Sequence, residues 1–146
     1  MLHNLCGLVA LACGASEEGQ SHGRKSVHAA HLEKAKRHIE QHLAESDLGP
    51  TTTADALGIS LGYLHRLFEP TGTSFTQYVQ RSRLMKCRDT LGSVSGAGRS
   101  VADIAFGWGF NSLATFYRAF AREFGSSPRS VGLSDDTTRR MVAPDQ

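Results

Sequence analysis

The stretch GRSVADIAFGWGFNSLATFYRAFAREFGSSP, residues 98–128, constrains the fold more than any other part of the chain. It predicts a short helix from Val101 to Phe106, a Gly-Trp-Gly break, and a second helix from Ser112 to Phe124 that ends at Gly-Ser-Ser-Pro. Two helices joined by a short glycine-containing turn outline a helix-turn-helix, whose second helix can enter a DNA major groove. The stretch therefore predicts helical structure and points toward DNA.

A second outline of the same kind precedes it. Residues 51–53, all threonine, supply cap candidates for a short helix that runs through Leu57 and breaks at Gly58. Ser60 then caps a helix over residues 61–68, which Pro70 stops. One helix-turn-helix outline arises by chance in many helical proteins, whereas two in tandem are far more specific.

A long helix from Ser74 to about Leu91 separates the two outlines. About 18 residues of helix span roughly 27 Å, and successive major-groove faces on one side of B-DNA lie about 34 Å apart. The bridging helix could therefore hold two recognition helices near that distance. The predicted fold class is all-α, with two helix-turn-helix subdomains joined by a long bridging helix.

Four segments are expected along the chain. Residues 1–15 form a helix, interpreted as the remnant of an upstream effector or dimerisation domain rather than a secretory signal, because only His3 precedes the apolar run. Residues 16–27 are small, polar and charged, and are expected to be a linker. Residues 28–132 form the tandem domain, beginning with a helix whose stripe is Leu32, Ala35, Ile39 and Leu43, and residues 133–146 form a flexible tail.

Charge and composition narrow the function classes. Residues 60–130 hold nine basic and four acidic side chains, a net +5, whereas the whole chain carries +2. Positive charge thus gathers on the segment with the helix-turn-helix outlines, as phosphate neutralisation requires. No apolar run approaches the roughly 18 residues that span a bilayer, so no membrane partner is expected. Three cysteines without metal spacing are typical of reduced thiols, which predicts a cytoplasmic location.

Neither an enzyme nor a metal protein is predicted. Cysteine and serine side chains lack a partnered acid–base motif, and nothing in the sequence requires a cofactor. His31, His38 and His42 fall on one helical face, but Glu40 lies in the middle of His38-Ile-Glu-Gln-His42, where zinc proteases do not place it. A polar helix edge is the preferred interpretation, since no third-ligand motif follows.

The tandem unit resembles the DNA-binding domain of the AraC/XylS family of transcription regulators. The residues that carry the resemblance lie in both units: ADALGIS over 54–60, YLHRLF over 63–68, GTSF over 72–75 with Tyr78, Arg83-Leu-Met, and the long pattern Gly109-Phe110, Phe116, Arg118, Phe120, Phe124-Gly125 and Ser127-Pro128. It covers roughly residues 29–131. The resemblance implies about seven helices and binding to adjacent major grooves of promoter DNA, with an activator as the expected role.

The aromatic residues of the last long helix are expected to be core, because Phe116, Phe120 and Phe124 recur every four positions. The resemblance places other side chains of the two recognition helices, about 60–69 and 112–124, toward DNA. Ser112 has a hydroxyl and free N–H groups for a phosphate, while Arg66 and Arg118 can take a guanine bidentately. The predicted DNA-binding set is Leu61, Gly62, His65, Arg66, Ser112, Leu113, Ala114, Thr115 and Arg118.

Some alternatives stay open at this stage. Arg118 could contact a phosphate only, or pair with Glu123 or Asp103. Arg81, Arg83, Lys86 and Arg88 on the bridging helix could be solvated or could touch the DNA backbone or RNA polymerase. A rival to the DNA reader is a helical protein-interaction module, or an anti-regulator on a DNA-binding fold that no longer reads sequence. Double-stranded promoter DNA is the expected partner, with RNA polymerase and dimerisation through a missing N-terminal domain as further ones.

Overall fold

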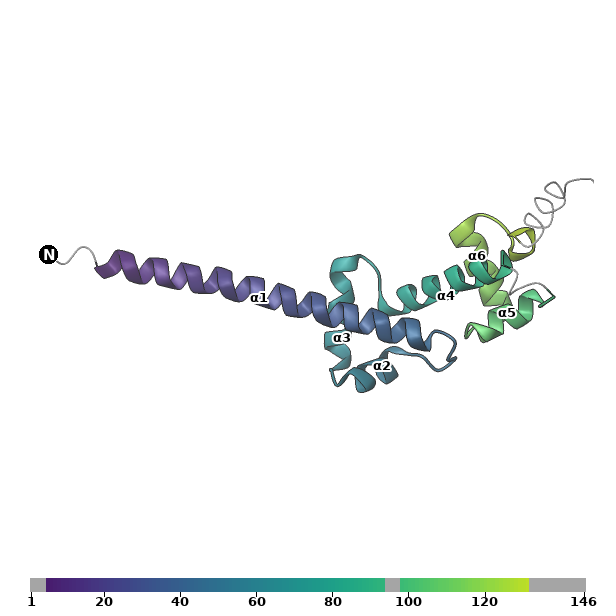
Figure 1. Cartoon of the computed structure of the whole chain (residues 1–146), viewed down its shortest axis with the longest axis horizontal. Helices are drawn as coiled ribbons and strands as arrows, with labels where there is room; N and C mark the ends of the chain where they lie inside the picture. Colours follow the sequence, from purple (N-terminus) through teal and green to yellow (C-terminus); the bar gives the residue numbers. More distant parts are fainter. Residues whose placement is uncertain (1–4, 94–97, 132–146) are drawn as a thin grey trace, which may run out of the picture.

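The computed structural model of the chain is all-α and describes residues 5–93 and 98–131, with side chains from residue 23 onward. Within these residues there is no strand, which confirms the predicted fold class. The elements are α1 (Leu5–His42), α2 (Pro50–Leu57), α3 (Leu61–Phe68), the 3-10 helix η1 (Glu69–Thr71), α4 (Phe75–Leu91), α5 (Val101–Gly107) and α6 (Leu113–Phe124) (Figure 1). A further helical turn begins at residues 128–131, and the expected tail over residues 133–146 lies outside the described part.

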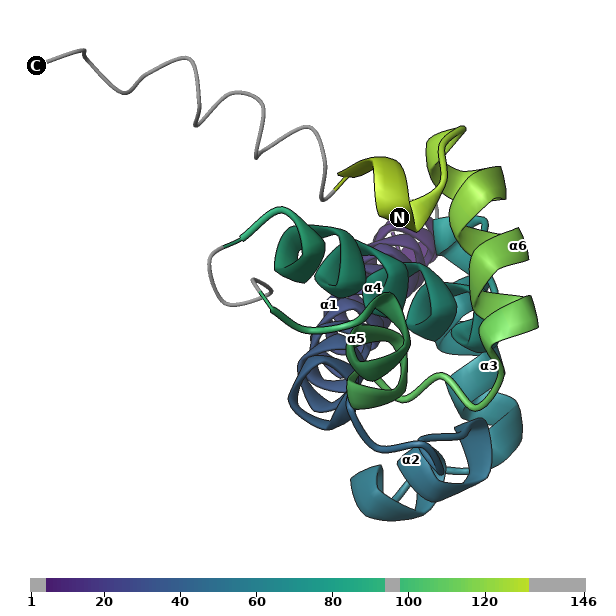
Figure 2. The ribbon, with the colours of Figure 1, turned by 90° about the vertical axis from the view of Figure 1, so that its right-hand side faces the viewer.

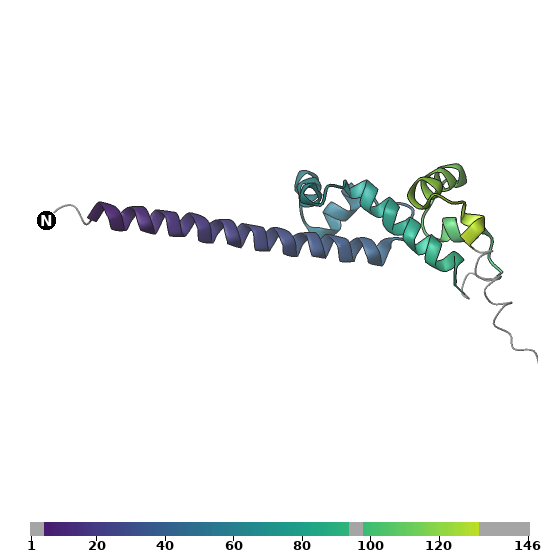
Figure 3. The same cartoon turned by 90° about the horizontal axis from the view of Figure 1, so that it is seen from above.

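The first helix differs from the prediction. Residues 16–27 were expected to be a linker, but α1 runs without interruption from Leu5 to His42 and projects well beyond the packed part of the molecule (Figures 1 and 3). Extending a helix that is already anchored needs no new nucleus, and this segment has no proline. Glu, Gln, Arg and Lys residues in this segment are good helix formers, and only its glycines carry a cost of about 1 kcal/mol each. Composition alone therefore does not predict the state of residues 16–27, because an anchored helix propagates into them.

The helix α3 begins at its predicted cap and α4 also begins with a serine cap, whereas one predicted cap is an exception. Ser60 accepts a hydrogen bond from the Tyr63 N–H at 3.1 Å, and Ser74 does the same for Gln77 at 3.2 Å. The exception is α2, whose cap is Gly49 and not a threonine. Pro50 takes the first helical position, where its missing N–H costs nothing.

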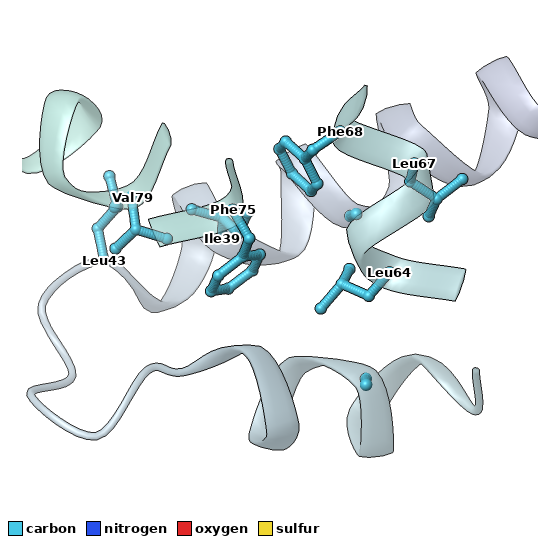
Figure 4. Packing of buried hydrophobic residues seen from close by; sticks show 9 residues of the cluster. Ile39, Leu43, Leu64, Leu67, Phe68, Phe75 and Val79 are labelled. Carbon is cyan, nitrogen blue, oxygen red and sulfur yellow. The ribbon is translucent and has the colours of Figure 1, made fainter. Parts of the chain in front are cut away.

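Two hydrophobic cores correspond to the two helix-turn-helix units. In the first, α1 contributes Ala35, Ile39 and Leu43, which pack against α3 and the start of α4 (Figure 4). In the second, Phe116 and Phe120 of α6 are fully buried and Phe124 is half-buried. The predicted apolar stripes are therefore confirmed. None of the helices in the described part has the length and hydropathy of a membrane-spanning helix.

Trp108, in the turn between α5 and α6, packs against both cores. Its indole N–H donates to the hydroxyl of Thr90 on α4 at 3.0 Å. The two units are thus joined by packing as well as by α4 itself.

Arg83 of α4 is a structural residue and not a solvated cation. Its Nε donates to the carbonyl oxygen of Leu43 at 2.9 Å, and its Nη2 donates to the carbonyl oxygen of Glu45 at 2.6 Å. These bonds satisfy carbonyls at the end of α1, where a helix leaves its last acceptors unpaired and favours a positive charge. Gly109 is buried directly against this contact.

The other basic residues of α4 differ in role from Arg83. Arg81 pairs with Glu123 at 2.9 Å, and the Arg88 guanidinium lies 4.9 Å from the centre of the Phe124 ring.

The half-buried His38 makes the fold sensitive to acid. Burial first, and then the stacked ring of His42 at 4.1 Å, lower the pKa of His38 below its ordinary value of 6.5. The unfolded chain therefore takes up this proton at a higher pH than the folded chain, so the free energy of unfolding is expected to fall as the pH drops below the ordinary histidine pKa of about 6.5.

We expect His38→Gln to flatten this pH dependence, measured as the urea midpoint at pH 7.5 and pH 5. His65→Gln, which removes an exposed histidine from α3, is the matched control, and the difference between the two variants isolates the effect of His38. Equal acid sensitivity in wild type and His38→Gln would contradict the prediction.

Candidate nucleic-acid interface

The first predicted recognition helix, α3, buries one face and exposes the other. Leu64, Leu67 and Phe68 face the core. The four residues predicted for DNA contact share the opposite face and are all exposed: Leu61, with 41% of its surface exposed, Gly62, His65 and Arg66. The exposed face of this eight-residue helix therefore carries a leucine side chain, a glycine, an imidazole and a guanidinium group.

The second predicted recognition helix, α6, has the same construction. Ser112 caps it by accepting the Thr115 N–H at 3.3 Å, and its own hydroxyl proton stays available for a phosphate. Ala114, Thr115 and Arg118 are exposed. Leu113 departs from the prediction in part, because it is half-buried and packs against the second core.

Neither recognition arginine is bound to a carboxylate. Glu123 pairs with Arg81 and not with Arg118. Asp103 accepts hydrogen bonds from the Ser100 hydroxyl and N–H, which lower its pKa and complete the cap of α5. Arg118 forms no ion pair within residues 23–93 and 98–131, and its Nε donates to the Ala114 carbonyl at 3.3 Å. The ion-pair alternative for Arg118 is therefore wrong.

Both recognition helices lie at the same side of the molecule. Figure 2 shows α3 and α6 along one edge, with α4 beside them toward the middle of the molecule, and the view in Figure 3 agrees. The 17 residues of α4 give it a length of about 25 Å. Two helices on one side of the molecule can face successive major grooves, which lie about 34 Å apart along one side of a duplex.

An open groove of about 840 Å³ lies between the two units, with α4 as its floor. It is lined by residues 71–73 after α3 and by the second half of α6, and its charged residues are Lys36, Arg81, Arg122 and Glu123. Three cations against one carboxylate give this surface a net positive charge. Within the described residues, no group of three His, Cys, Asp or Glu side chains lies close enough together to hold a metal ion.

A family model described as a helix-turn-helix domain matches residues 53–132, which is more than half of the chain and includes both units. The chain belongs to the AraC/XylS family. The predicted resemblance is thereby confirmed, and AraC/XylS membership makes the chain part of a family of DNA-binding transcription regulators and not of enzymes.

Curated AraC/XylS relatives are much longer proteins. The transcriptional activator RhaS of Enterobacter sp. (strain 638) is 36% identical over 110 residues, which cover 75% of this chain and 38% of RhaS. The transcriptional activator NphR of Rhodococcus sp. is 36% identical over 97 residues, which cover 66% of this chain and 28% of NphR. The chain thus spans about a third of the length of the relatives it matches.

Solved AraC/XylS domains share the fold. The C-terminal domain of AraT, a response regulator from Geobacillus stearothermophilus, aligns with a TM-score of 0.63 and 27% identity, over 70% of this chain and 84% of that domain. The DNA-binding domain of the transcriptional factor AdpA, solved in complex with a target DNA, aligns with a TM-score of 0.64 and 24% identity, over 75% of this chain and 96% of that domain. At that identity the AdpA likeness shows the fold alone.

Sequence reasoning did not find one group of contacts on the recognition surface of this AraC/XylS domain. His28 and His31 of α1 reach α3, where they contact Arg66 and Tyr63. These pairs are 38 and 32 residues apart in sequence. Local periodicity assigns His31 to a polar helix edge and carries no signal for its partner.

Proposed function

We propose that the chain is the DNA-reading part of a bacterial transcription activator, which inserts α3 and α6 into adjacent major grooves of promoter DNA. The observation that supports this most is that two capped helices lie on the same side of the molecule, each with its apolar face buried and an arginine exposed. Activators among the relatives support the direction of regulation. No observation favours the protein-interaction module.

In this proposal the exposed faces divide the work. Arg66 and Arg118 read bases, since bidentate arginine–guanine contact is the commonest specific contact in the major groove. Leu61 and Ala114 can offer apolar contact to thymine methyl groups, with Leu113 contributing only the part of its side chain that the core leaves open. Gly62, His65, Ser112 and Thr115 complete the surface, with Ser112 placed for a phosphate.

The remaining partners belong to the same proposal. An activator acts on RNA polymerase, so we propose that the chain contacts the polymerase while both are bound at the promoter. This function is carried out in the cytoplasm. The matched part covers only 38% of RhaS and 28% of NphR, so an additional domain joined to α1 would supply dimerisation and the response to an effector.

The deciding experiment is selection of duplexes from a random pool by the chain, followed by affinity measurements from 50 to 200 mM salt. We expect an enriched sequence, and a logarithm of affinity that falls linearly with the logarithm of salt by about 0.9 for each phosphate neutralised. Binding to the selected duplex no tighter than to a scrambled one would refute the proposal and favour the interaction module.

A further inference from the structure

Two histidines of α1, His28 and His31, contact α3 beside Arg66. The Nε2–H of His28 donates to the carbonyl oxygen of Arg66 at 3.2 Å. The Nδ1 of His31 and the hydroxyl of Tyr63 share a hydrogen bond of 3.0 Å. Both imidazoles meet the Tyr63 ring edge-on, with centroids 6.3 and 5.7 Å away. Tyr63 is therefore fixed in orientation by contacts from a different helix.

The fixed ring in turn supports the Arg66 side chain. The guanidinium carbon lies 5.8 Å from the centroid of the Tyr63 ring, within the roughly 6 Å at which a cation is attracted to an aromatic face. Within residues 23–93 and 98–131, Arg66 has no ion-pair partner that would hold it elsewhere. A free arginine loses much rotamer freedom when it binds a base, and a side chain held beforehand loses less.

The second unit offers an internal comparison. The residue three positions before Arg118 is Thr115, where the first unit has Tyr63 before Arg66. Arg118 instead bonds to the carbonyl of its own helix at Ala114. The aromatic support is thus a feature of the first unit and not of the helix-turn-helix geometry in general.

We propose that Tyr63, held by His28 and His31, is a positioning residue that orients Arg66 for base readout. The first reading surface then consists of α3 together with the segment of α1 around residues 28–31. The inference rests on the proposed function, because it concerns how Arg66 reads its base.

The test uses the duplex that the wild-type chain selects. In this duplex, the base pair read by Arg66 is identified as the one whose substitution weakens binding of the wild type but not of Arg66→Ala. Tyr63→Leu should weaken binding to this duplex about two- to fivefold, as expected for a cation–aromatic contact at an exposed site. It should also reduce discrimination at that one base pair, and it should have no further effect when Arg66 is already alanine. Tyr63→Phe, which keeps the ring and loses the His31 bond, should fall between wild type and Tyr63→Leu.

The possible failures can be told apart. If wild type selects no sequence, the proposed function fails. If selection succeeds but no base pair depends on Arg66, or if Tyr63→Leu weakens the selected and base-substituted duplexes equally, the positioning role is refuted. The same holds if the losses from Tyr63→Leu and Arg66→Ala simply add. Thermal unfolding of each variant shows whether a loss of affinity reflects a loss of folded protein.

Discussion

Replacing Gly109 by alanine is expected to lower the free energy of unfolding by about 2–5 kcal/mol. Gly109 has a φ of +81°, a region that costs a residue with a Cβ about 1–2 kcal/mol. A Cβ built there would also lie 2.9 Å from the guanidinium of Arg83 and 2.9 Å from the carbonyl oxygen of Leu43. Arg83 cannot move aside without losing its bonds to the end of α1.

Gly125→Ala is the matched control for this prediction. Gly125 has a similar φ of +66°, but nothing lies within 4 Å of the position of its Cβ. It should therefore show the backbone cost alone, about 1–2 kcal/mol. Urea unfolding followed by helical circular dichroism measures both variants. Equal losses would mean that the junction of Arg83, Gly109 and Leu43 yields easily, contrary to the prediction.

Loss of the two recognition arginines is expected to abolish most of the sequence preference. Arg66→Ala and Arg118→Ala should each cost about 1–3 kcal/mol of binding free energy, roughly five- to a hundredfold in Kd for the selected duplex. The two costs should add, because the arginines lie on separate helices and share no contact partner. The binding assay is a mobility shift at fixed salt, repeated with duplexes that carry single base-pair substitutions.

The same assay distinguishes base contact from phosphate contact for Arg118. A base contact predicts that Arg118→Ala relaxes the preference at one base pair, whereas a phosphate contact predicts uniform weakening and a salt slope reduced by about one. Lys34→Ala is the control, since it removes one positive charge from an exposed position on α1. If Lys34→Ala weakens binding as much as either arginine variant, charge alone explains the affinity and the readout by Arg66 and Arg118 is refuted.

The features that sequence predicts well are local ones. Ser60 caps its helix as predicted, and both recognition helices end where glycine or proline was expected to end them, because each signal acts within four residues. The four-residue recurrence of Phe116 and Phe120 identifies the buried face in the same way. The candidate DNA contacts were assigned from the resemblance to the AraC/XylS family, and most of them lie on the exposed faces of α3 and α6.

What sequence could not predict depends on distant partners. Arg83 looks like any basic residue of a helix, and only the fold brings it to carbonyls 38 and 40 residues away. His31 and Tyr63 are in the same position. Leu113 was predicted to face the DNA groove, yet its side chain is partly buried against the second core. Residues 16–27 show the converse limit, since their state depends on the anchored helix that continues into them.

Under the proposed function, the junction of Arg83, Gly109 and Leu43, together with the Trp108–Thr90 contact, would also restrict how a binding site can evolve. In that proposal, the distance between α3 and α6 is set by the packing of the two units through α4 and Trp108. Base pairs beneath each helix can be exchanged for others and compensated by a change in one side chain. The number of base pairs between them cannot, because each added pair shifts the second element by about 3.4 Å and turns it by roughly 35°. For such a protein, spacing is inherited more strictly than sequence.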